Sequence, residues 1–354
     1  MSGLQILLLI LGIMISVAVI GTVCLLALSP KPVIRWLRRR LENGGPLDYP
    51  ADFAARLQRV EAIRNQTYPS AHGRNTFDLF LPKDRTGDEK LPVIVYIHGG
   101  FFVAGDKRGV EHLALSFASE GMAVASMNYQ WAPEAKFPIQ LDQVCQCIHA
   151  LHTLEETGCP IDTGRVVLAG DSAGAYYAAQ AAALYTNPAL RSALGLDGTP
   201  LDGKIAGCLL FCGPYDMRAF AHTENWLFRL LFGYIGWSVT GKRKWYRHPL
   251  MDSACVPDHV TPQYPPSYIT DGNYISFESH GRLLERTLKG KGVFCRSRFF
   301  TELEEKVPHV YEAQMSTPNG LLAFNDAVSF LRELGLLGTA DGRAHSAPSG
   351  RDAI

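Results

Sequence analysis

The stretch VVLAGDSAGAYYAAQ, residues 166–180, places a serine in the sharpest corner of the chain. An apolar run ends at Gly170 and Asp171, Ser172 follows, and an alanine-rich segment typical of a helix begins around Gly174. A strand, a tight turn and a helix around G-x-S-x-G form a nucleophile elbow, which holds the serine hydroxyl above the edge of a sheet. A glycine-rich turn without chemistry is the alternative. The position between a strand and a helix favours a serine nucleophile.

The composition allows a large core and gives no sign of a nucleic-acid partner. The chain has 354 residues, of which 47% are apolar and 19% charged, and its formal net charge is zero. A chain of this length and apolar content can form one large domain or two small ones. Because nucleic-acid binding usually requires a basic face, we expect no nucleic-acid partner.

The first 30 residues are typical of a membrane anchor. From Ile6 to Leu28 there are 23 residues without a charge. As a helix, this stretch would measure about 34 Å, enough to cross a hydrocarbon core of about 30 Å. A cleaved signal peptide is the alternative, but it needs a basic segment first and a shorter apolar run. We therefore predict a single-pass transmembrane helix in residues 1–30.

The residues that flank this helix predict its orientation. Five basic residues follow it closely: Lys31, Arg35, Arg38, Arg39 and Arg40. Since positive residues stay on the cytoplasmic side, the catalytic domain is expected in the cytoplasm. The seven cysteines beyond the span lack the spacing of a disulfide framework, which agrees with a reducing compartment. The glycosylation sequon at Asn65 points the other way, but such triplets often arise by chance.

Two further segments are assigned from composition. Residues 31–74 are expected to be a juxtamembrane linker and an N-terminal cap region. Within them, 31–44 is basic with interspersed apolar residues, which suits a helix at the lipid boundary or an ordinary solvated linker helix. Residues 338–354 are polar and rich in Gly and Ser, and predict a disordered tail.

Residues 75–337 alternate predicted strands with predicted helices. Strands are expected at 76–82, as an edge strand, and at 91–100, 122–129, 165–170, 204–213, 266–272 and 294–300. Helices are expected at 139–156, 173–185, 276–290 and 319–334. This alternation predicts an α/β fold with a mostly parallel, doubly wound sheet. The carboxyl ends of the strands then share one edge, where active sites gather.

One segment, 214–265, interrupts this alternation. It is rich in aromatic and aliphatic side chains, among them Trp226, Phe232 and Trp237. We expect a helical cap inserted beside the site. The alternative is an ordinary pair of helices packed on the core.

A second loop with adjacent glycines follows a buried strand in YIHGGFFVAGD, residues 96–106. Such a loop can direct backbone N–H groups at a carbonyl oxygen. We expect Gly99, Gly100 and the N–H of Ala173 to form an oxyanion hole, in which one donor is typically worth about 2.7–4 kcal/mol. His98 ends the strand before these donors and is expected to be structural.

A nucleophilic serine needs a base and an acid that orients the base. Of the 11 histidines, His309 has the best position, in a loop after the last strand and ahead of the last helix. His280 lies on a helix and is expected away from the strand ends. The acid should follow a strand between the serine and His309. Asp271 in SYITDGNY meets this condition, and Asp216 in CGPYDM is the alternative.

Three motifs together resemble the hormone-sensitive-lipase branch of the α/β-hydrolases: HGGFFVAGD (98–106), NYQWAPEAKFP (128–138) and GDSAG (170–174). More narrowly, FCGPYD, YITDGN and PHVYEAQMSTP resemble a group of bacterial membrane-anchored hydrolases of that branch. The resemblance covers roughly residues 75–335. It implies an α/β-hydrolase fold and hydrolysis of carboxylic esters without a metal or cofactor.

Two positions depart from the pattern of that branch. Phe101 stands where the HGGG loop has its third glycine, which implies a narrower acyl pocket. The D-x-L pattern of the acid puts Asn273 at the acid position, two residues after Asp271. We expect Asp271 to serve as the acid through a local shift of the loop.

Together these features predict a membrane-tethered serine esterase that cleaves apolar acyl or aryl esters through an acyl-enzyme. Cys145 and Cys147 are not expected to bind metal, because residues two apart do not share a helix face. An amidase or deacetylase with the same residues is one alternative. A non-catalytic scaffold that kept the fold is another. The oligomeric state and the physiological substrate stay open.

Overall fold

The computed structural model describes residues 2–42, 47–84 and 90–338. An eight-stranded sheet has the order β1-β2-β4-β3-β5-β6-β7-β8. Its strands are β1 Val60–Thr67, β2 Thr76–Pro82, β3 Leu91–Ile97, β4 Ala123–Met127, β5 Ile161–Asp171, β6 Ile205–Phe211, β7 Ser267–Asp271 and β8 Cys295–Phe299. The helices are α1 Gly3–Leu28, α2 Lys31–Glu42, α3 Phe53–Gln58, α4 Glu111–Ser119, α5 Ile139–Glu156, α6 Ala173–Thr186, α7 Pro188–Ala193, α8 Trp226–Thr240, α9 Glu278–Gly290 and α10 Pro318–Glu333.

The sheet is mostly parallel, which confirms the predicted fold class. The pairs β1–β2 and β2–β4 are antiparallel, whereas every neighbouring pair from β4 to β8 is parallel. The expectation that β2 forms the edge is wrong, because β1 pairs along its outer side. The sequence of β1, VEAIRNQT, is largely polar and contains a bulge between Ile63 and Gln66, so it shows no regular alternation.

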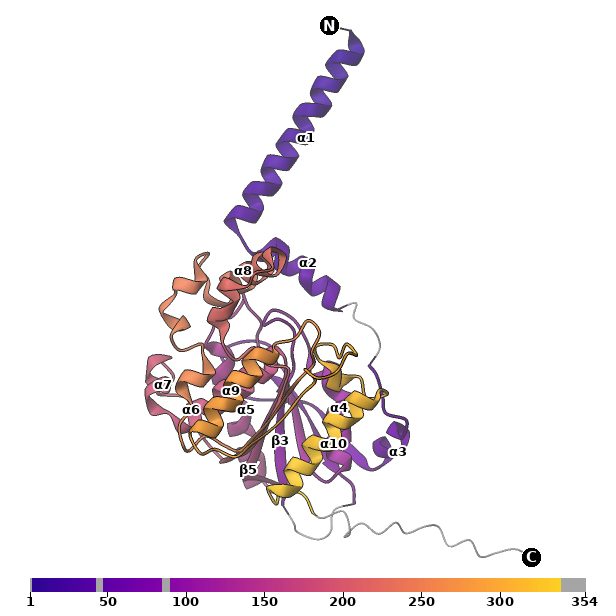
Figure 1. Cartoon of the computed structure of the whole chain (residues 1–354), viewed down its shortest axis with the longest axis vertical. Coiled ribbons are helices and arrows are strands. Elements are labelled where there is room, and N and C mark those ends of the chain that lie inside the picture. Colours follow the sequence, from indigo (N-terminus) through magenta and orange to yellow (C-terminus); the bar gives the residue numbers. More distant parts are fainter. Residues whose placement is uncertain (1, 43–46, 85–89, 339–354) are drawn as a thin grey trace, which may run out of the picture.

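Both faces of the sheet are covered by helices (Figure 1). In β3, Val93, Val95 and Ile97 join one buried cluster, and the intervening Ile94 and Tyr96 join another. This alternation follows from the two-residue period of a strand. Helices α5, α6 and α9 contribute to the first cluster, and α4 and α10 to the second. A strand with both faces buried reads as a continuous apolar run, as β3 does.

The segment between β6 and β7 contains α8 and four short 3₁₀ helices. Phe232, Ile235 and Val239 of α8 are buried against the body, while Trp226 and Leu227 at its start are exposed. This helix lies across the body near the base of α1 (Figure 1). The later turns of α8 thus pack on the core, while its first turn stays exposed. The predicted limits of a cap, 214–265, stay a prediction.

Helix α1 extends from the body without any buried residue (Figure 1). Among the described residues, it is the one helix that is long and apolar enough to cross a membrane. Helix α2 turns back onto the body and buries Ile34 and Leu37. Arg38 fixes it further by pairing with Glu134. The predicted disordered tail lies outside the described residues, except for residue 338.

Candidate active site

Ser172 occupies the turn between β5 and α6 in a strained conformation, with φ 49° and ψ −117°. A positive φ is unfavourable for a side chain with a Cβ, so the surroundings must hold this geometry. The flanking glycines make the turn possible. A Cβ on Gly174 would lie 1.9 Å from the carbonyl oxygen of Ile97, and one on Gly170 would lie 2.5 Å from the carbonyl carbon of Gly174. Only glycine allows β3, β5 and α6 to approach this closely.

The ring of His309 lies against the serine. Its Nε2 is 3.0 Å from Oγ of Ser172, although 137 positions separate the two residues. The imidazole comes from the loop between β8 and α10, where its backbone N–H donates to the carbonyl of Tyr274. Phe277 contacts the ring edge-on, with 4.9 Å between the ring centroids. The predicted nucleophile and base are therefore within hydrogen-bond distance.

Asp271 is the carboxylate on the other side of the ring. It ends β7 and is almost fully buried. Its Oδ1 lies 3.6 Å from Nδ1 of His309, slightly beyond hydrogen-bond distance, and the buried Nδ1 has no hydrogen-bond partner among the described residues. The carboxylate itself is held by the backbone N–H groups of Gly272 and Phe277, each at 2.8 Å.

The two other acid candidates have structural contacts of their own. Asn273 accepts the N–H of Val307 through Oδ1, and its Nδ2 donates to three carbonyls of the loop that leads to His309. Asp216 caps a short 3₁₀ helix and pairs with Arg218. Asn273 thus shapes the loop that carries the histidine, while Asp271, two residues earlier, faces its ring.

The oxyanion loop differs from the prediction at one residue. The N–H of Gly99 donates to Oδ1 of Asp171 at 3.0 Å and is therefore not free to bind an oxyanion in this structure. The N–H groups of Gly100, Phe101 and Ala173 make no backbone or side-chain hydrogen bond within the described part of the chain. The N–H groups of Gly100 and Ala173, which the sequence predicts as donors, are thus not engaged elsewhere, and neither is that of Phe101. Sequence reasoning missed Phe101 because it treated this position as a lost glycine.

His98 and His280 are placed differently with respect to the site. His98 is buried and stacks on Tyr129, with Nδ1 2.7 Å from the carbonyl oxygen of Gly99. Burial lowers the pKa of His98 to about 4, which keeps the ring neutral and agrees with the expected structural role. His280 was expected away from the strand ends, but it lines the same cavity as His309. That expectation is wrong, because α9 begins directly beside the end of β7.

Two buried acids next to the site were not found from the sequence. Burial raises the pKa of Asp171 to about 6. Burial, followed by the charge of Asp171, raises the pKa of Glu312 to about 8. The thiol of Cys212 donates to Oε2 of Glu312 at 3.2 Å and accepts the N–H of Val310 at 3.3 Å. Cys212 and Glu312 therefore support the loop directly after His309.

Cys212, Asp271 and His309 also place possible metal-ligand atoms within 4.8 Å of one another. Nε2 of His309 already contacts the hydroxyl of Ser172. Burial holds the pKa of the Cys212 thiol well above its usual range, so the thiolate that a metal would need is disfavoured. Cys145 and Cys147 are buried in the core beside the sheet. The chemistry of these side chains thus fits acyl transfer better than metal binding.

A cavity of about 320 Å³ adjoins His309, and we call it the active-site cavity. Its walls come from the oxyanion loop, from the segment between β6 and β7, and from the start of α9. Aromatic side chains dominate the lining: Phe101, Phe220, Phe228, Phe232 and Phe277. The cavity is suited to an apolar group bound next to a nucleophile.

Comparison with known proteins agrees with this geometry. A family model described as alpha/beta hydrolase fold matches residues 94–312. Esterase B from Lactobacillus rhamnosis superposes with a TM-score of 0.68 at 19% identity, covering 80% of this chain and 90% of the other. An esterase from Pyrobaculum calidifontis gives 0.62 at 19%, with 87% and 94% covered. A bacterial heroin esterase gives 0.60 at 19%, with 78% and 85% covered. At these identities the solved structures share the fold.

Proposed function

The chain belongs to the alpha/beta hydrolase fold family, and from this premise we propose that it is a serine hydrolase that cleaves carboxylic esters. The observation that carries the proposal is the 3.0 Å contact between Nε2 of His309 and Oγ of Ser172. Serine is a weak nucleophile until a neighbouring base removes its proton. The similarity in fold to proteins named as esterases supports the same class of reaction.

The first half of the reaction forms an acyl-enzyme. As Oγ of Ser172 bonds to the ester carbonyl carbon, its proton moves to Nε2 of His309. The carbonyl oxygen becomes an oxyanion and accepts hydrogen bonds from the N–H groups of Gly100, Phe101 and Ala173. When the intermediate collapses, the bond to the alcohol oxygen breaks, and the leaving alcohol takes the proton from Nε2.

The second half returns the enzyme to its starting state. A water molecule gives a proton to Nε2 of His309 and attacks the acyl carbon. Oγ of Ser172 then leaves and takes the proton back, which releases the carboxylic acid. In both halves His309 becomes a cation for a short time. Asp271, 3.6 Å away in the resting state, stabilises this cation, and such contacts often tighten only in the reacting complex.

The lining of the active-site cavity supports an apolar acyl or aryl ester as substrate. Five phenylalanines surround the space beside His309. One of them, Phe101, stands where the HGGG loop of the branch that the sequence resembles has its third glycine. A cavity of about 320 Å³ lies at the small end of the range for ligand sites.

We further propose that α1 is a retained membrane anchor with the catalytic body on the cytoplasmic side. A helix of 26 residues is about 39 Å long, more than the hydrocarbon core requires. The chain directly after it is fixed to the body through Ile34 and Leu37, which suits a permanent tether. The basic residues that follow the span favour the cytoplasmic side.

The test is labelling with a fluorophosphonate probe combined with ester turnover. Wild-type protein should label and should hydrolyse p-nitrophenyl esters, while Ser172→Ala should do neither. Equal labelling of both proteins would contradict the mechanism. A matched p-nitroanilide measures whether amides are turned over as well. Hydrolysis of the anilide at a rate comparable to that of the ester would favour an amidase.

A further inference from the structure

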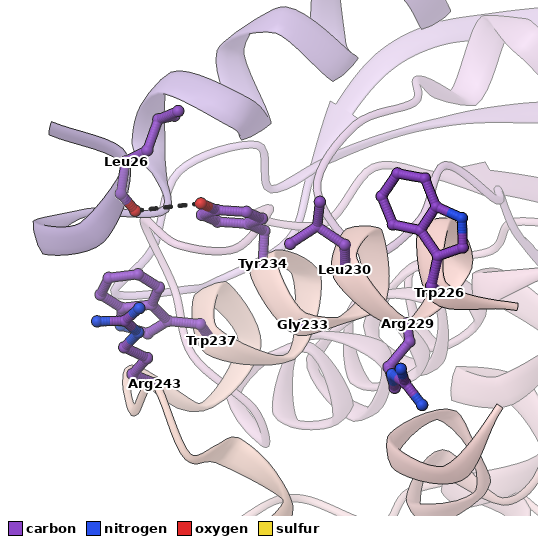
Figure 2. A pocket seen from close by; sticks show the side chains of 8 residues that line it. All are labelled: Leu26, Trp226, Arg229, Leu230, Gly233, Tyr234, Trp237 and Arg243. Carbon is purple, nitrogen blue, oxygen red and sulfur yellow. Dashed lines mark hydrogen bonds between the residues drawn. The ribbon is translucent and has the colours of Figure 1, made fainter. Parts of the chain in front are cut away.

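Helix α8 separates two cavities. On one side, Phe228 and Phe232 line the active-site cavity. On the other side lies a second cavity of about 420 Å³, which we call the outer cavity. Figure 2 shows that the outer cavity lies between α8 and the end of α1, with the carbonyl oxygen of Leu26 directed at the hydroxyl of Tyr234. The wall that closes the active-site cavity therefore also borders the apolar N-terminal helix.

Two hydrogen bonds attach this region to α1. The hydroxyl of Tyr234 donates to the carbonyl of Leu26 at 3.2 Å (Figure 2), and Nη1 of Arg243 donates to the carbonyl of Ala27 at 3.2 Å. The last carbonyls of a helix lack partners within the helix, so these bonds satisfy groups that would otherwise need water. They hold α8 at the level where the apolar helix ends.

The first turns of α8 expose large apolar side chains at this level. Trp226 is 68% exposed and Leu227 58% exposed. Contiguous exposed apolar side chains of this size indicate an interaction surface. Besides Trp226, the outer cavity is lined by one more tryptophan, a tyrosine and two arginines, residue types that concentrate where a bilayer meets water. A bilayer that surrounds α1 is the partner that suits both the position and the composition.

The active-site cavity reaches the surface at the same place. Phe228 lines that cavity, is 36% exposed, and follows Trp226 and Leu227 in the first turns of α8. An apolar ester that dissolves in the bilayer could therefore reach His309 along the start of α8 without entering bulk water.

We propose that the exposed start of α8 lies in the surface layer of the bilayer that holds α1, and that the protein takes long-chain esters directly from this bilayer. The proposal rests on the membrane tether and on the ester hydrolysis proposed above. It assigns α8 as the membrane-facing entrance and names the substrate class as esters partitioned into lipid.

The position of α8 can be measured without using activity. The full-length protein is reconstituted in phosphatidylcholine vesicles, with and without brominated lipid that quenches nearby tryptophan. Trp226→Phe should remove a strongly quenched part of the emission. Trp245→Phe, at a buried tryptophan, should remove a part that is hardly quenched. If the emission lost in Trp226→Phe is not quenched by brominated lipid, the proposal is wrong.

The substrate source is tested with two esters that share one leaving group. Leu227→Glu changes an exposed residue that lines neither cavity, and Leu57→Glu on α3 is the matched control at 48% exposed. Hydrolysis of p-nitrophenyl acetate in solution should stay near wild type in both variants. Hydrolysis of p-nitrophenyl palmitate within the vesicles should fall about tenfold in Leu227→Glu alone, as for a tenfold weaker affinity of the entrance for the bilayer.

The outcomes separate this proposal from the proposed function. Equal hydrolysis of palmitate by Leu227→Glu and wild type would overturn the entrance, and so would a parallel loss with both esters. If wild-type protein cleaves neither ester, ester hydrolysis itself fails. The quenching experiment would then still decide whether α8 lies in the bilayer.

Discussion

The N–H of Gly99 donates a hydrogen bond of 3.0 Å to Oδ1 of Asp171, which joins the oxyanion loop to the residue before the nucleophile. The two residues are 72 positions apart in the sequence and meet where the parallel strands β3 and β5 end side by side. A Cβ on Gly99 would lie only 2.3 Å from Oδ2 of the same carboxyl group, so the contact needs glycine at this position. Gly99 thus positions the loop, and its neighbours are left to bind the oxyanion.

This contact predicts different effects for two substitutions of Asp171. Asp171→Asn keeps an acceptor for the N–H of Gly99 and should retain kcat/KM close to wild type. Asp171→Ala leaves a buried donor without a partner, which costs about 1–3 kcal/mol of folding free energy. It should also lower kcat, because the loop loses its anchor. Denaturant unfolding and ester kinetics check both effects, and an alanine variant as stable as wild type would contradict the role of this bond.

The acid is tested by Asp271→Asn. An amide cannot stabilise the imidazolium form of His309 as a carboxylate does, and this substitution in a serine triad lowers kcat by roughly 10,000-fold. KM should change little, because Asp271 lies behind the ring and does not line the active-site cavity. The measurement is kcat and KM on a short p-nitrophenyl ester.

Asp216→Asn is the matched control for this prediction. Asp216 also follows a strand, but it caps a short helix and pairs with Arg218. Its variant should therefore keep kcat near wild type. If Asp216→Asn lowers kcat more than Asp271→Asn does, the assignment of the acid must be reversed.

The sequence predicts the parallel sheet and the corner at Ser172 well, because both depend on local patterns. Apolar runs mark β3, β4 and β6, and glycines at fixed spacing mark the turn. The first strand, β1, could not be predicted in this way. It lies at the edge of the sheet, so its polar side chains remain solvated and the strand shows no apolar run.

The parts of the candidate site that depend on long-range contacts are harder to predict from the sequence. The order of residues predicts Ser172 and His309, and the structure brings them together. Whether Asp271 or Asn273 faces the ring depends on the path of one loop, which Asn273 itself holds through four hydrogen bonds. The engagement of Gly99 and the burial of Glu312 depend on neighbours far away in the chain. No local pattern indicates them.

The width of the active-site cavity is tested by Phe101→Gly. Phe101 has φ 55°, and a left-handed conformation costs a residue with a Cβ about 1–2 kcal/mol, so glycine relieves strain there. Removing the ring enlarges the cavity beside His309. We expect kcat/KM for longer p-nitrophenyl acyl esters to rise relative to that for the acetate, with stability close to wild type. The measurement is a series of acyl lengths in detergent solution.

Phe102→Gly separates this effect from a general loosening of the loop. Phe102 also has a positive φ, 67°, but its ring is buried edge-on against Tyr176 and Tyr177. Its removal should cost about 3–5 kcal/mol of stability through the cavity it leaves. The preference for acyl length should not change. An unchanged preference in Phe101→Gly would mean that the acyl group does not bind beside Phe101.

The buried carboxyl group of Glu312 makes stability depend on pH in a defined direction. Burial raises its pKa from 4.5 to about 8, so the folded state favours the protonated form. The protonated Glu312 therefore contributes its full share to the free energy of unfolding below pH 4.5, the pKa in the unfolded chain. This contribution is lost as the pH rises to about 8, the pKa in the folded protein. Asp171 acts in the same direction, but its pKa of about 6 places most of its effect below pH 6.5. The interval from pH 6.5 to 8.5 therefore isolates Glu312.

Glu312→Gln measures this contribution, because the amide keeps the shape of the side chain and can still accept the thiol proton of Cys212. Relative to the variant, wild-type protein should lose about 2 kcal/mol of unfolding free energy between pH 6.5 and 8.5. All other titratable groups are present in both proteins, so their effect cancels in the difference. Urea unfolding at several pH values gives the two curves. Parallel curves would mean that Glu312 is already ionised at pH 6.5, and its role as a neutral hydrogen-bond partner beside the His309 loop would have to be abandoned.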